Sequence, residues 1–444
     1  MFEKILIANR GEIAIRIMRT CENLGISTIV IYSEADKDSL HVKLADKAYF
    51  IGGPRVADSY LNMEKIFEIA QICDVDAIHP GYGLLSENAE FARKCEEKGF
   101  VFIGPSPNII SAMGDKIKAR SMMKKAGVPV VPGISHPLLS VEEAIIEAEK
   151  IGYPIMLKAS SGGGGIGMQV VRSRNEMHKA YESNQKRAKS FFGHSEMYLE
   201  KYLENPRHIE IQLLADQEGN TVFLWERECS IQRRHQKIVE EAPSSFIDEQ
   251  TRLRMGEIAV LAAKEIGYTN AGTIEFLVDQ DKNFYFLEMN TRIQVEHPVT
   301  EEITGIDIVE QQIKIAQGHT LPFTQKQINR SGHAIEVRIY AEDPKTHFPS
   351  PGTITKLSLP HDDGVRHEIG VHSKSTVTHF YDPMIAKLIV KGKNRQQAIE
   401  RLVKTLDSYE IEGIKTNIPM LQKIVTHQAF LNGDTTTEFV KNYL

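Results

Sequence analysis

The stretch 283–298, NFYFLEMNTRIQVEHP, constrains the fold more than any other segment, because apolar and polar residues alternate from Leu287 onward. Successive side chains of a β-strand point to opposite faces, so an extended chain would separate the two kinds. The face that we expect to be core carries Leu287, Met289, Thr291, Ile293 and Val295. The other face carries Glu288, Asn290, Arg292, Gln294 and Glu296. The pattern predicts a strand that continues to Glu296 and is ended by Pro298.

A second strand, expected over residues 272–278, precedes this one and contains Glu275. A turn near residues 279–283 would join the two in an antiparallel hairpin that places Glu275 opposite Glu288. Directly opposed carboxylates destabilise a hairpin by roughly 0.2–1 kcal/mol, and a divalent cation between them would remove that penalty. With the amide oxygen of Asn290, they form hard ligands suited to Mg²⁺ or Mn²⁺. A solvated outer face is the alternative, but such faces usually carry Lys, Thr and Ser.

Short apolar runs alternate with helical patterns in the first part of the chain. We expect strands over residues 4–8, 28–32, 48–51, 77–79 and 101–103, with a helix over 13–24. Strands that alternate with helices are typical of a parallel sheet covered on both faces. The chain has 444 residues and needs more than one core, so we expect this first domain to end near Gly114.

The remaining chain divides into three stretches. A linker around residues 129–133 leads into a small subdomain that ends near Lys201 and has helices over 141–151 and 175–189 and strands over 154–159 and 168–171. From His208 to about Gly318 the pattern is alternating and rich in strands. The last block begins at Gly332, with strands over 334–340 and 384–390 and helices from Arg395.

A glycine-rich loop, residues 160–167, lies between two of the expected strands of this subdomain. Glycines allow backbone N–H groups to approach a phosphate closely. The loop has neither the Lys-Ser/Thr nor the helix of a Walker P-loop, so it is interpreted as a flap over phosphates. A flexible turn without function is the alternative. Lys158, just before the loop, could meet the phosphates as a point charge or be a solvated strand-end lysine.

Further charged groups lie on neighbouring strand patterns. His208, Glu210 and Gln212 alternate with apolar residues, as do Glu336 and Arg338, and each set alone fits a plain amphipathic strand. Residues 232–237, QRRHQK, concentrate cationic donors. Such a run is usually a solvated face, and beside a phosphate site it could clamp the anion.

The composition excludes several classes of protein. The net charge is −6, which argues against a large nucleic-acid interface, although not against a local phosphate pocket. Cys21, Cys73, Cys95 and Cys229 form no C-x-x-C pair, which favours reduced thiols over disulfides or structural zinc. The sequence shows neither a signal peptide nor an apolar run long enough to span a membrane. We therefore expect a cytoplasmic protein without nucleic-acid or membrane partners.

Six motifs together resemble the biotin carboxylase family, and the resemblance covers essentially the whole chain. They are ANRGEIA (8–14), HPGYGLLSEN (79–88), GGGGIGM (162–168), QRRHQK (232–237), EMNTRIQVEHPVTE (288–301) and GHAIEVRIYAED (332–343). The resemblance implies an ATP-grasp fold of the α/β and α+β classes. It would comprise a Rossmann-like parallel-sheet domain (1–114), an ATP-grasp domain (115–330) whose lid spans about 131–203, and a mixed C-terminal catalytic domain (331–444).

The resemblance also implies roles for individual residues. ATP would be bound by Lys116, Lys158, Gly162, Gly163, Gly164, Gly165, Gly167, Glu200, Lys201, Leu203, His208, Gln232, His235 and Leu277. The metal would be held by Glu275, Glu288 and Asn290. Bicarbonate would be bound by Lys237, Arg292, Gln294 and the backbone of Val295. The catalytic residues would be Glu296 as general base, Arg338 beside biotin, and the cations Lys237 and Arg292.

The implied reaction is the first half-reaction of a biotin-dependent carboxylase. Glu296 would take the proton of bicarbonate, which attacks the γ-phosphate of ATP, and the resulting carboxyphosphate would release CO₂ for biotin. Two departures from the family pattern are Ile166, where Arg or Lys is commoner, and Glu228, where Asp is commoner. The first could change flap closure or nucleotide affinity, and the second is minor.

The expected partners follow from the same resemblance. The chain shows no Met-Lys-Met biotin-attachment signal up to Leu444, so we expect biotin on a separate carrier protein, together with carboxyltransferase subunits and a homodimer. The expected pathway is acetyl-CoA carboxylation for fatty acid synthesis, with another acyl-CoA or a keto acid as the alternative acceptor. The rival functions are an ATP-grasp ligase that joins a carboxylate to an amine, and an inactive regulatory or scaffold subunit.

Overall fold

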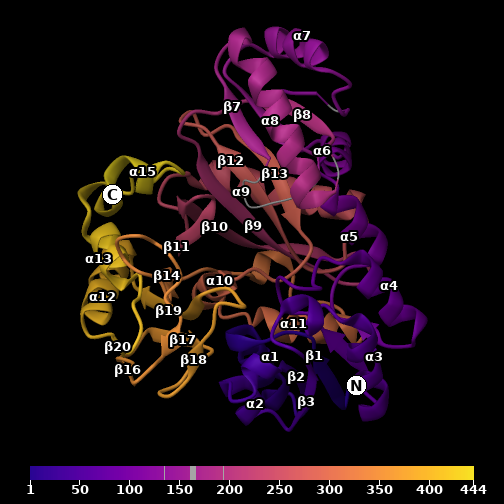
Figure 1. Ribbon diagram of the computed structural model, residues 1–444, viewed down its shortest axis with the longest axis vertical. Helices are drawn as coiled ribbons and strands as arrows, with labels where there is room; N and C mark the ends of the chain where they lie inside the picture. Colours follow the sequence, from indigo (N-terminus) through magenta and orange to yellow (C-terminus); the bar gives the residue numbers. More distant parts are fainter. Residues whose placement is uncertain (135, 161–166, 194) are drawn as a thin grey trace.

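The computed structural model describes residues 1–134, 136–160, 167–193 and 195–444, and Figure 1 shows their arrangement. The glycines Gly162 to Gly165, expected to bind ATP, and Ile166 lie outside the described residues. Among the residues that the structure describes, no helix is long and apolar enough to cross a membrane.

The N-terminal part is a parallel sheet with strand order β3-β2-β1-β4-β5, as predicted. Its strands are β1 (Lys4–Ile7), β2 (Ser27–Ser33), β3 (Lys47–Gly52), β4 (Ala77–His79) and β5 (Val101–Phe102). The helices of this part are α1 (Gly11–Asn23), α2 (Leu40–Leu44), α3 (Met63–Cys73), α4 (Ala89–Glu97) and α5 (Pro107–Gly114), with 3₁₀ turns at Glu34–Asp36 and Val56–Asp58.

Apolar residues on both faces of the β-strands hold this sheet between two layers. Ile5 and Ile7 of β1 pack into one core with Ile13 and Ile17 of α1. The intervening Leu6 packs into the opposite core, with residues of α3 and α4. A strand buried on both faces is the usual consequence of parallel pairing with helical crossovers. The β1–α1 junction thereby places the ANRGE segment at the carboxyl edge of the sheet.

A small subdomain follows and lies at one end of the molecule (Figure 1). Its antiparallel sheet has the order β7-β6-β8, formed by β6 (Ile155–Ala159), β7 (Met168–Val171) and β8 (Met197–Lys201). Its helices are α7 (Val141–Ile151) and α8 (Arg174–Phe192), and α6 (Lys116–Lys125) precedes it. The predicted linker is hydrogen-bonded at both ends, since Pro129 O accepts from Phe286 N at 2.7 Å and Pro132 O accepts from Lys201 N at 2.7 Å.

A large antiparallel sheet with the order β13-β12-β9-β10-β11-β14-β19-β17 forms the rest of the framework. Its strands are β9 (Arg207–Ala215), β10 (Thr221–Arg233), β11 (Gln236–Ala242), β12 (Asn270–Val278), β13 (Phe284–Asn290), β14 (His333–Tyr340), β17 (Val365–Ile369) and β19 (Met384–Gly392). The pairing of β11 with β14 carries this sheet across residue 330 into the last part of the chain.

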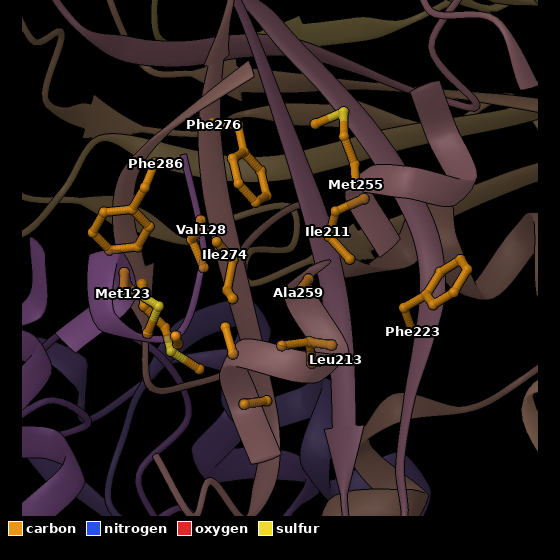
Figure 2. Close-up of a cluster of buried hydrophobic side chains, with 14 of the residues drawn as sticks. Met123, Val128, Ile211, Leu213, Phe223, Met255, Ala259, Ile274, Phe276 and Phe286 are labelled. Atoms are coloured by element: carbon orange, nitrogen blue, oxygen red, sulfur yellow. The ribbon is translucent and has the colours of Figure 1, made fainter. Parts of the chain in front are cut away.

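Three helices interrupt the stretch 208–318, which the sequence pattern predicted only as strand-rich: α9 (Glu249–Glu265), α10 (His297–Thr304) and α11 (Ile308–Ala316). Figure 2 shows Met255 and Ala259 of α9 beside Ile211 and Phe223. A Cβ on Gly256 would lie 2.6 Å from the ring of Phe223. The helix buries mostly small residues, and Leu253 and Leu261 are exposed, so its large apolar side chains do not form the stripe that reveals an amphipathic helix.

The C-terminal part packs against the end of the large sheet that contains β14 and β19. Its remaining elements are α12 (Arg395–Asp407), α13 (Ile418–Thr426), α14 (Gln428–Leu431), α15 (Phe439–Tyr443) and two small sheets, β15 (Gly352–Thr353) with β18 (Thr376–Val377) and β16 (Lys356–Ser358) with β20 (Glu410–Glu412). Ala398 and Leu402 of α12 pack into one core with Val337 and Leu388 of the sheet.

Candidate active site

A cavity of about 1040 Å³ lies where these parts meet, and it contains the predicted site. It is lined by Lys116, Lys158, Glu200, Lys201, Leu203, His208, Gln232, His235, Lys237, Glu275, Leu277, Glu288, Asn290, Arg292, Gln294, Val295, Glu296 and Arg338, all of them predicted site residues. Gly167 is different. Its carbonyl accepts from Ala159 N at 2.9 Å at the base of the glycine loop, and it is not among the lining residues.

The β12–β13 hairpin has the predicted register, with Glu275 directly opposite Glu288. The register shifts by one residue at the next pair, where Phe276 lies opposite Phe286. Leu287 is the extra residue of this β-bulge, and it lines the cavity instead of joining the core. Its expected place on the core face was therefore wrong, whereas Met289 is buried as predicted.

The predicted extension of the strand to Glu296 is also wrong, because β13 ends at Asn290. Residues 291–296 turn, and helix α10 begins at His297 with Pro298 in its first turn. Proline lacks an N–H and has a fixed φ, so it starts a helix as readily as it ends a strand. The turn nevertheless brings Arg292, Gln294 and Glu296 to the same cavity as Glu288 and Asn290.

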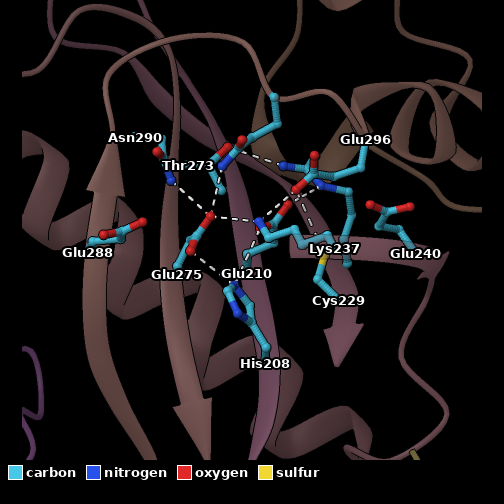
Figure 3. A network of polar contacts seen from close by, with 12 residues as sticks. His208, Glu210, Cys229, Lys237, Glu240, Thr273, Glu275, Glu288, Asn290 and Glu296 are labelled. Carbon is cyan, nitrogen blue, oxygen red and sulfur yellow. Dashed lines mark hydrogen bonds and ion pairs between the residues drawn. The ribbon is translucent and has the colours of Figure 1, made fainter. Parts of the chain in front are cut away.

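Lys237, from β11, is the central cation of the site. Its Nζ donates to Glu210 at 2.7 Å, to Glu275 at 2.7 Å and to Glu296 at 2.6 Å. Figure 3 shows its side chain reaching between these carboxylates, which come from β9, β12 and the start of α10. A single ammonium therefore joins the predicted metal ligand Glu275 to the predicted base Glu296.

The amide and guanidinium groups beside Glu275 form a continuous chain of hydrogen bonds. Asn290 Nδ2 and Gln294 Nε2 donate to Glu275 Oε1 at 2.8 and 2.9 Å. Arg292 donates to Asn290 Oδ1 at 3.0 Å and to Gln294 Oε1 at 2.8 Å. It also donates to Glu87 at 2.8 Å. Arg292 is thus held across the mouth of the β12–β13 hairpin by the HPGYGLLSEN segment.

Arg338 of β14 approaches Glu296 from the other side. Its Nη2 donates to Glu296 Oε2 at 2.9 Å, and its Nε donates to Glu240 Oε1 at 2.6 Å. Glu296 is only 1% exposed, so this carboxylate has a buried cation at each oxygen. Such pairs offset part of the penalty of burying the three charges.

The charges at the centre shift the titration of these groups strongly. Burial would raise the pKa of Glu296, but Lys237, Arg338 and Arg227 outweigh it and hold the pKa well below its usual range. Burial would also raise the pKa of Glu275, but Lys237 and His208 outweigh it and hold that pKa well below its usual range. Glu296 is consequently an ionised carboxylate, ready to accept a proton once its cationic partners turn to another anion.

The part of the cavity that is predicted to bind the nucleotide is also rich in cations. Lys158 lies against Glu200 in β8, and Arg120 Nη1 is 3.4 Å from the same carboxylate. Burial, with Lys116 nearby, lowers the pKa of Lys158 to about 7. Lys116 Nζ donates to Glu288 Oε2 at 3.4 Å. Lys116 and Lys158 can therefore neutralise a phosphate chain in this part of the cavity. Each of them also contacts a carboxylate of the protein.

Other predicted nucleotide residues have backbone and side-chain partners that fix them around the cavity. Gln232 Nε2 lies 2.9 Å from His208 Nδ1, and His208 Nε2 lies 3.0 Å from Glu275. Lys201 Nζ donates to the carbonyls of Gly152 at 2.9 Å and Tyr153 at 3.1 Å. His235 is in the β10–β11 turn with φ of 66° and lines the cavity.

The sequence itself matches three family models that cover nearly its whole length. They are described as Biotin carboxylase, N-terminal domain (residues 1–110), Carbamoyl-phosphate synthase L chain, ATP binding domain (115–324) and Biotin carboxylase C-terminal domain (336–442). Biotin carboxylase 2 of Bacillus subtilis (strain 168) is 64% identical over 444 residues, which is 100% of both chains. The chain belongs to the biotin carboxylase family.

Other relatives also match over their whole length or most of it. Biotin carboxylase of Halalkalibacterium halodurans is 63% identical over 100% of this chain and 98% of its own, and a pyruvate carboxylase subunit of Methanothermobacter thermautotrophicus is 53% identical over 100% and 90%. The solved biotin carboxylase–β,γ-ATP complex of Campylobacter jejuni superposes with a TM-score of 0.98 at 48% identity, covering 100% and 99%.

A second solved structure is the biotin carboxylase domain dimer of Hydrogenobacter thermophilus 2-oxoglutarate carboxylase, in complex with MgADP, ADP and bicarbonate. It has a TM-score of 0.97 at 50% identity and covers 100% of this chain and 98% of its own. The resemblance drawn from the motifs is thereby confirmed, and with it the ATP-grasp fold. The chain is an ATP-dependent ligase of the biotin carboxylase type, which carries out the biotin-carboxylating half-reaction.

The residues at the expected metal site suit the ion of this family. Glu275 and Glu288 are paired across β12 and β13, and Asn290 lies next to Glu275. Oxygen ligands of this kind are those that Mg²⁺ prefers, and it usually takes the rest of its shell from water and phosphate. The ligand atoms of His208, Glu210 and Glu275 also lie within 4.8 Å of one another, but the ammonium of Lys237 already contacts the two carboxylates.

Several residues of this biotin carboxylase site were not among those proposed from the sequence. Glu210 holds Lys237 and also accepts from Arg227, which donates in turn to Thr300 at 2.9 Å. Glu240 holds Arg338, and burial raises the pKa of Glu240 to about 7. Only the strand of Glu210 carried a signal in the sequence, which was its alternation of polar and apolar residues. It could not tell which polar face was buried.

Proposed function

We propose that this cavity carboxylates biotin with ATP and bicarbonate through carboxyphosphate. The observation that carries the proposal is the position of Glu296, a buried carboxylate between Lys237 and Arg338. A base with a cation on each side can exchange those cations for an anionic substrate and then take the proton of that substrate. The three residues therefore provide a place for bicarbonate and a group to activate it.

ATP would bind with its phosphates toward Lys116 and Lys158 and its base toward Lys201 and Leu203, all of which line the cavity. His208, Gln232, His235, Glu200 and Leu277 would complete the nucleotide site. Glu275, Glu288 and Asn290 would hold Mg²⁺, or Mn²⁺ in its place. The ion, when bound, supplies positive charge that the phosphates need during transfer.

Bicarbonate would lie among Lys237, Arg292, Gln294 and the backbone of Val295. Glu296 takes its proton, and an oxygen of the resulting carbonate attacks the γ-phosphorus of ATP. The bond between that phosphorus and the β–γ bridging oxygen breaks, and ADP leaves with the electron pair. The cations around the site stabilise the negative charge that spreads over the transferred phosphoryl group.

Carboxyphosphate would then break into CO₂ and phosphate inside the same cavity. The phosphate takes the proton from N1 of biotin, and N1 forms the new bond to CO₂. Arg338 would act in this step, because its guanidinium can stabilise the oxygen of the deprotonated ureido ring. Its anchor on Glu240 keeps the guanidinium aimed into the cavity when Glu296 becomes protonated.

For the protein as a whole we propose acetyl-CoA carboxylation for fatty acid synthesis in the cytoplasm. A biotin carrier and carboxyltransferase subunits would be its partners, and it would form a homodimer. The high identity to biotin carboxylases supports this assignment, while the similarity to the pyruvate carboxylase of Methanothermobacter thermautotrophicus makes a keto acid the second candidate acceptor. We also propose domain boundaries after residues 114 and 330, with the lid over about 131–203.

The proposal is tested by measuring ADP release with bicarbonate, free biotin or both left out. We expect release to depend on both substrates. An ATP turnover that ignores them but responds to an amine and a carboxylate would indicate the rival carboxylate–amine ligase. Co-purification of a biotinylated carrier and a carboxyltransferase would identify the acceptor pathway, since each carboxyltransferase takes its own acyl-CoA or keto acid.

A further inference from the structure

Lys387, in β19, is a fully buried lysine that no step above uses. Its side chain is 0% exposed, and its Nζ donates to the carbonyl oxygen of Val295 at 2.7 Å. The same Nζ lies 3.2 Å from Glu12 Oε1. Taking an ammonium out of water costs several kcal/mol unless its partners are well placed. A lysine kept here therefore needs a reason beyond filling space.

Lys387 and its two polar partners come from three separate parts of the chain. Glu12 lies in the first turn of α1, beside the N-terminal sheet. Val295 belongs to the turning segment 291–296, and Lys387 itself belongs to the large sheet. Tyr82 donates its hydroxyl to Glu12, and its ring lies 5.9 Å from Lys387 Nζ. One buried group thus joins helix α1 and the large sheet to the segment that leads into the predicted base.

Lys387 is also the direct cross-strand partner of Arg338. The two residues are in register between β14 and β19, and directly paired residues project on the same face of a sheet. Arg338 holds the carboxylate of Glu296, while Lys387 holds the carbonyl of the peptide bond that joins Val295 to Glu296. The side chain of Glu296 and the carbonyl of the residue before it are therefore fixed by two neighbouring cations of one sheet.

The segment around Val295 needs such support because it lies outside any strand or helix. Glu296 has φ and ψ of −82° and 11° at the start of α10, and no side-chain cap bond is formed there. Rotation of the 295–296 peptide would move Glu296 relative to Lys237 and Arg338. Displacements of about 1 Å can cost about a hundredfold in rate. A fixed carbonyl at Val295 prevents this rotation.

We propose that Lys387 is a positioning residue that sets the bicarbonate-binding segment 294–296 by holding the Val295 carbonyl, with Glu12 as its anchor. The inference rests on the proposed function, because it assigns Lys387 to the bicarbonate part of that same site. It explains the buried ammonium, the choice of a backbone acceptor and the contact with the N-terminal domain. Lys387 acts through Val295 and Glu296 and does not touch the substrates.

The test replaces Lys387 by methionine, which has similar length and no ammonium. We expect the KM for bicarbonate to rise about tenfold or more, because the segment is misplaced. The Kd for ADP, measured by calorimetry, should stay within about twofold, because the nucleotide end of the cavity is unchanged. The matched control is Lys391→Met on the same strand. The ammonium of Lys391 also donates to a backbone carbonyl, that of Glu302, and neither residue lines the cavity.

A second variant keeps the proposal testable if Lys387→Met does not fold. Glu12→Gln removes the charge that anchors Lys387 and retains a hydrogen-bond acceptor, and it should raise the KM for bicarbonate by about threefold to tenfold. A bicarbonate KM that is unchanged in every variant that folds, or a loss in kcat alone, would overturn the inference and leave the proposed function standing. A wild-type protein that releases ADP without bicarbonate would overturn both.

Discussion

Lys237 and Glu296 form an ion pair at the centre of the cavity, with 2.6 Å between Nζ and Oε1. The lysine comes from β11 and the carboxylate from the start of α10, so the pair exists only in the folded protein. It holds the carboxylate ionised, but it also makes Glu296 a weak base until another anion takes the lysine. We infer that arrival of bicarbonate between them is the event that activates the base.

The first prediction concerns this base. Glu296→Gln keeps the size of the side chain and removes its ability to accept a proton, so biotin-dependent ADP release should fall by about 10²–10⁴-fold. Binding of ADP should persist, since the nucleotide end is separate. Steady-state kinetics and calorimetry check the two statements. The control is Glu302→Gln in the same helix, outside the cavity, and activity retained by Glu296→Gln would rule out the assigned role.

The second prediction concerns the metal. Glu288 contacts Lys116, whereas Glu275 also binds Lys237, Asn290 and Gln294. Glu288→Gln is therefore the cleaner probe of ligation. It should raise the Mg²⁺ concentration for half-maximal activity about tenfold, as expected for losing one charged contact. The exposed Glu257→Gln on α9 should leave the Mg²⁺ titration unchanged. An unaltered titration for both would remove Glu288 from the metal site.

The third prediction compares two lysines in one helix. Lys116 faces the cavity from the first turn of α6, and Lys118, two residues later, is largely exposed. Lys116→Met should raise the Kd for ADP about tenfold, since hydrogen bonds to charged groups contribute about 1.5–3 kcal/mol. Lys118→Met should change it by less than about twofold, as distant surface charges do. Equal effects in both variants would indicate general attraction instead of a contact.

The sequence was informative wherever function depended on local spacing. The predicted opposition of Glu275 and Glu288 is present, but turn spacing alone does not produce it. The register next to the turn would place Glu275 opposite Leu287, and the bulge at Leu287 restores the predicted pair. The bulge at Leu287 was not foreseen, because alternation does not mark where a strand takes an extra residue. The end of the strand at Asn290 was missed for a related reason, since alternation continues through residues that the fold turns.

Long-range partners were harder to predict than the site residues themselves. Lys237 lies in a basic run of the kind that is usually a solvated face. What makes it central is that β9, β12 and α10 bring three carboxylates to it, and no spacing in the sequence encodes that meeting. Lys387 is a still clearer case, because a lysine in an apolar strand shows its function only when Val295 and Glu12 are seen beside it.

The last prediction concerns pH and a residue that departs from the family pattern. Glu228 in β10 is buried, accepts from Ser244 at 2.6 Å and also contacts Ser230. Burial raises its pKa to about 7, although Arg207 opposes the shift. Between its unfolded pKa near 4.5 and about 7 the native protein binds the extra proton, so stability from this group is present at low pH and is lost as pH rises.

Glu228→Gln cannot ionise, so relative to wild type it should gain about 3 kcal/mol of stability as the pH rises from about 4.5 to above 7. Urea unfolding at a series of pH values measures this difference, and the single tryptophan, Trp225, lies in the same strand and reports on the sheet. Glu257→Gln, on the exposed side of α9, serves as the control and should follow wild type. A difference between Glu228→Gln and wild type that stays constant across this range would show that Glu228 is already ionised at low pH, with Arg207 outweighing burial.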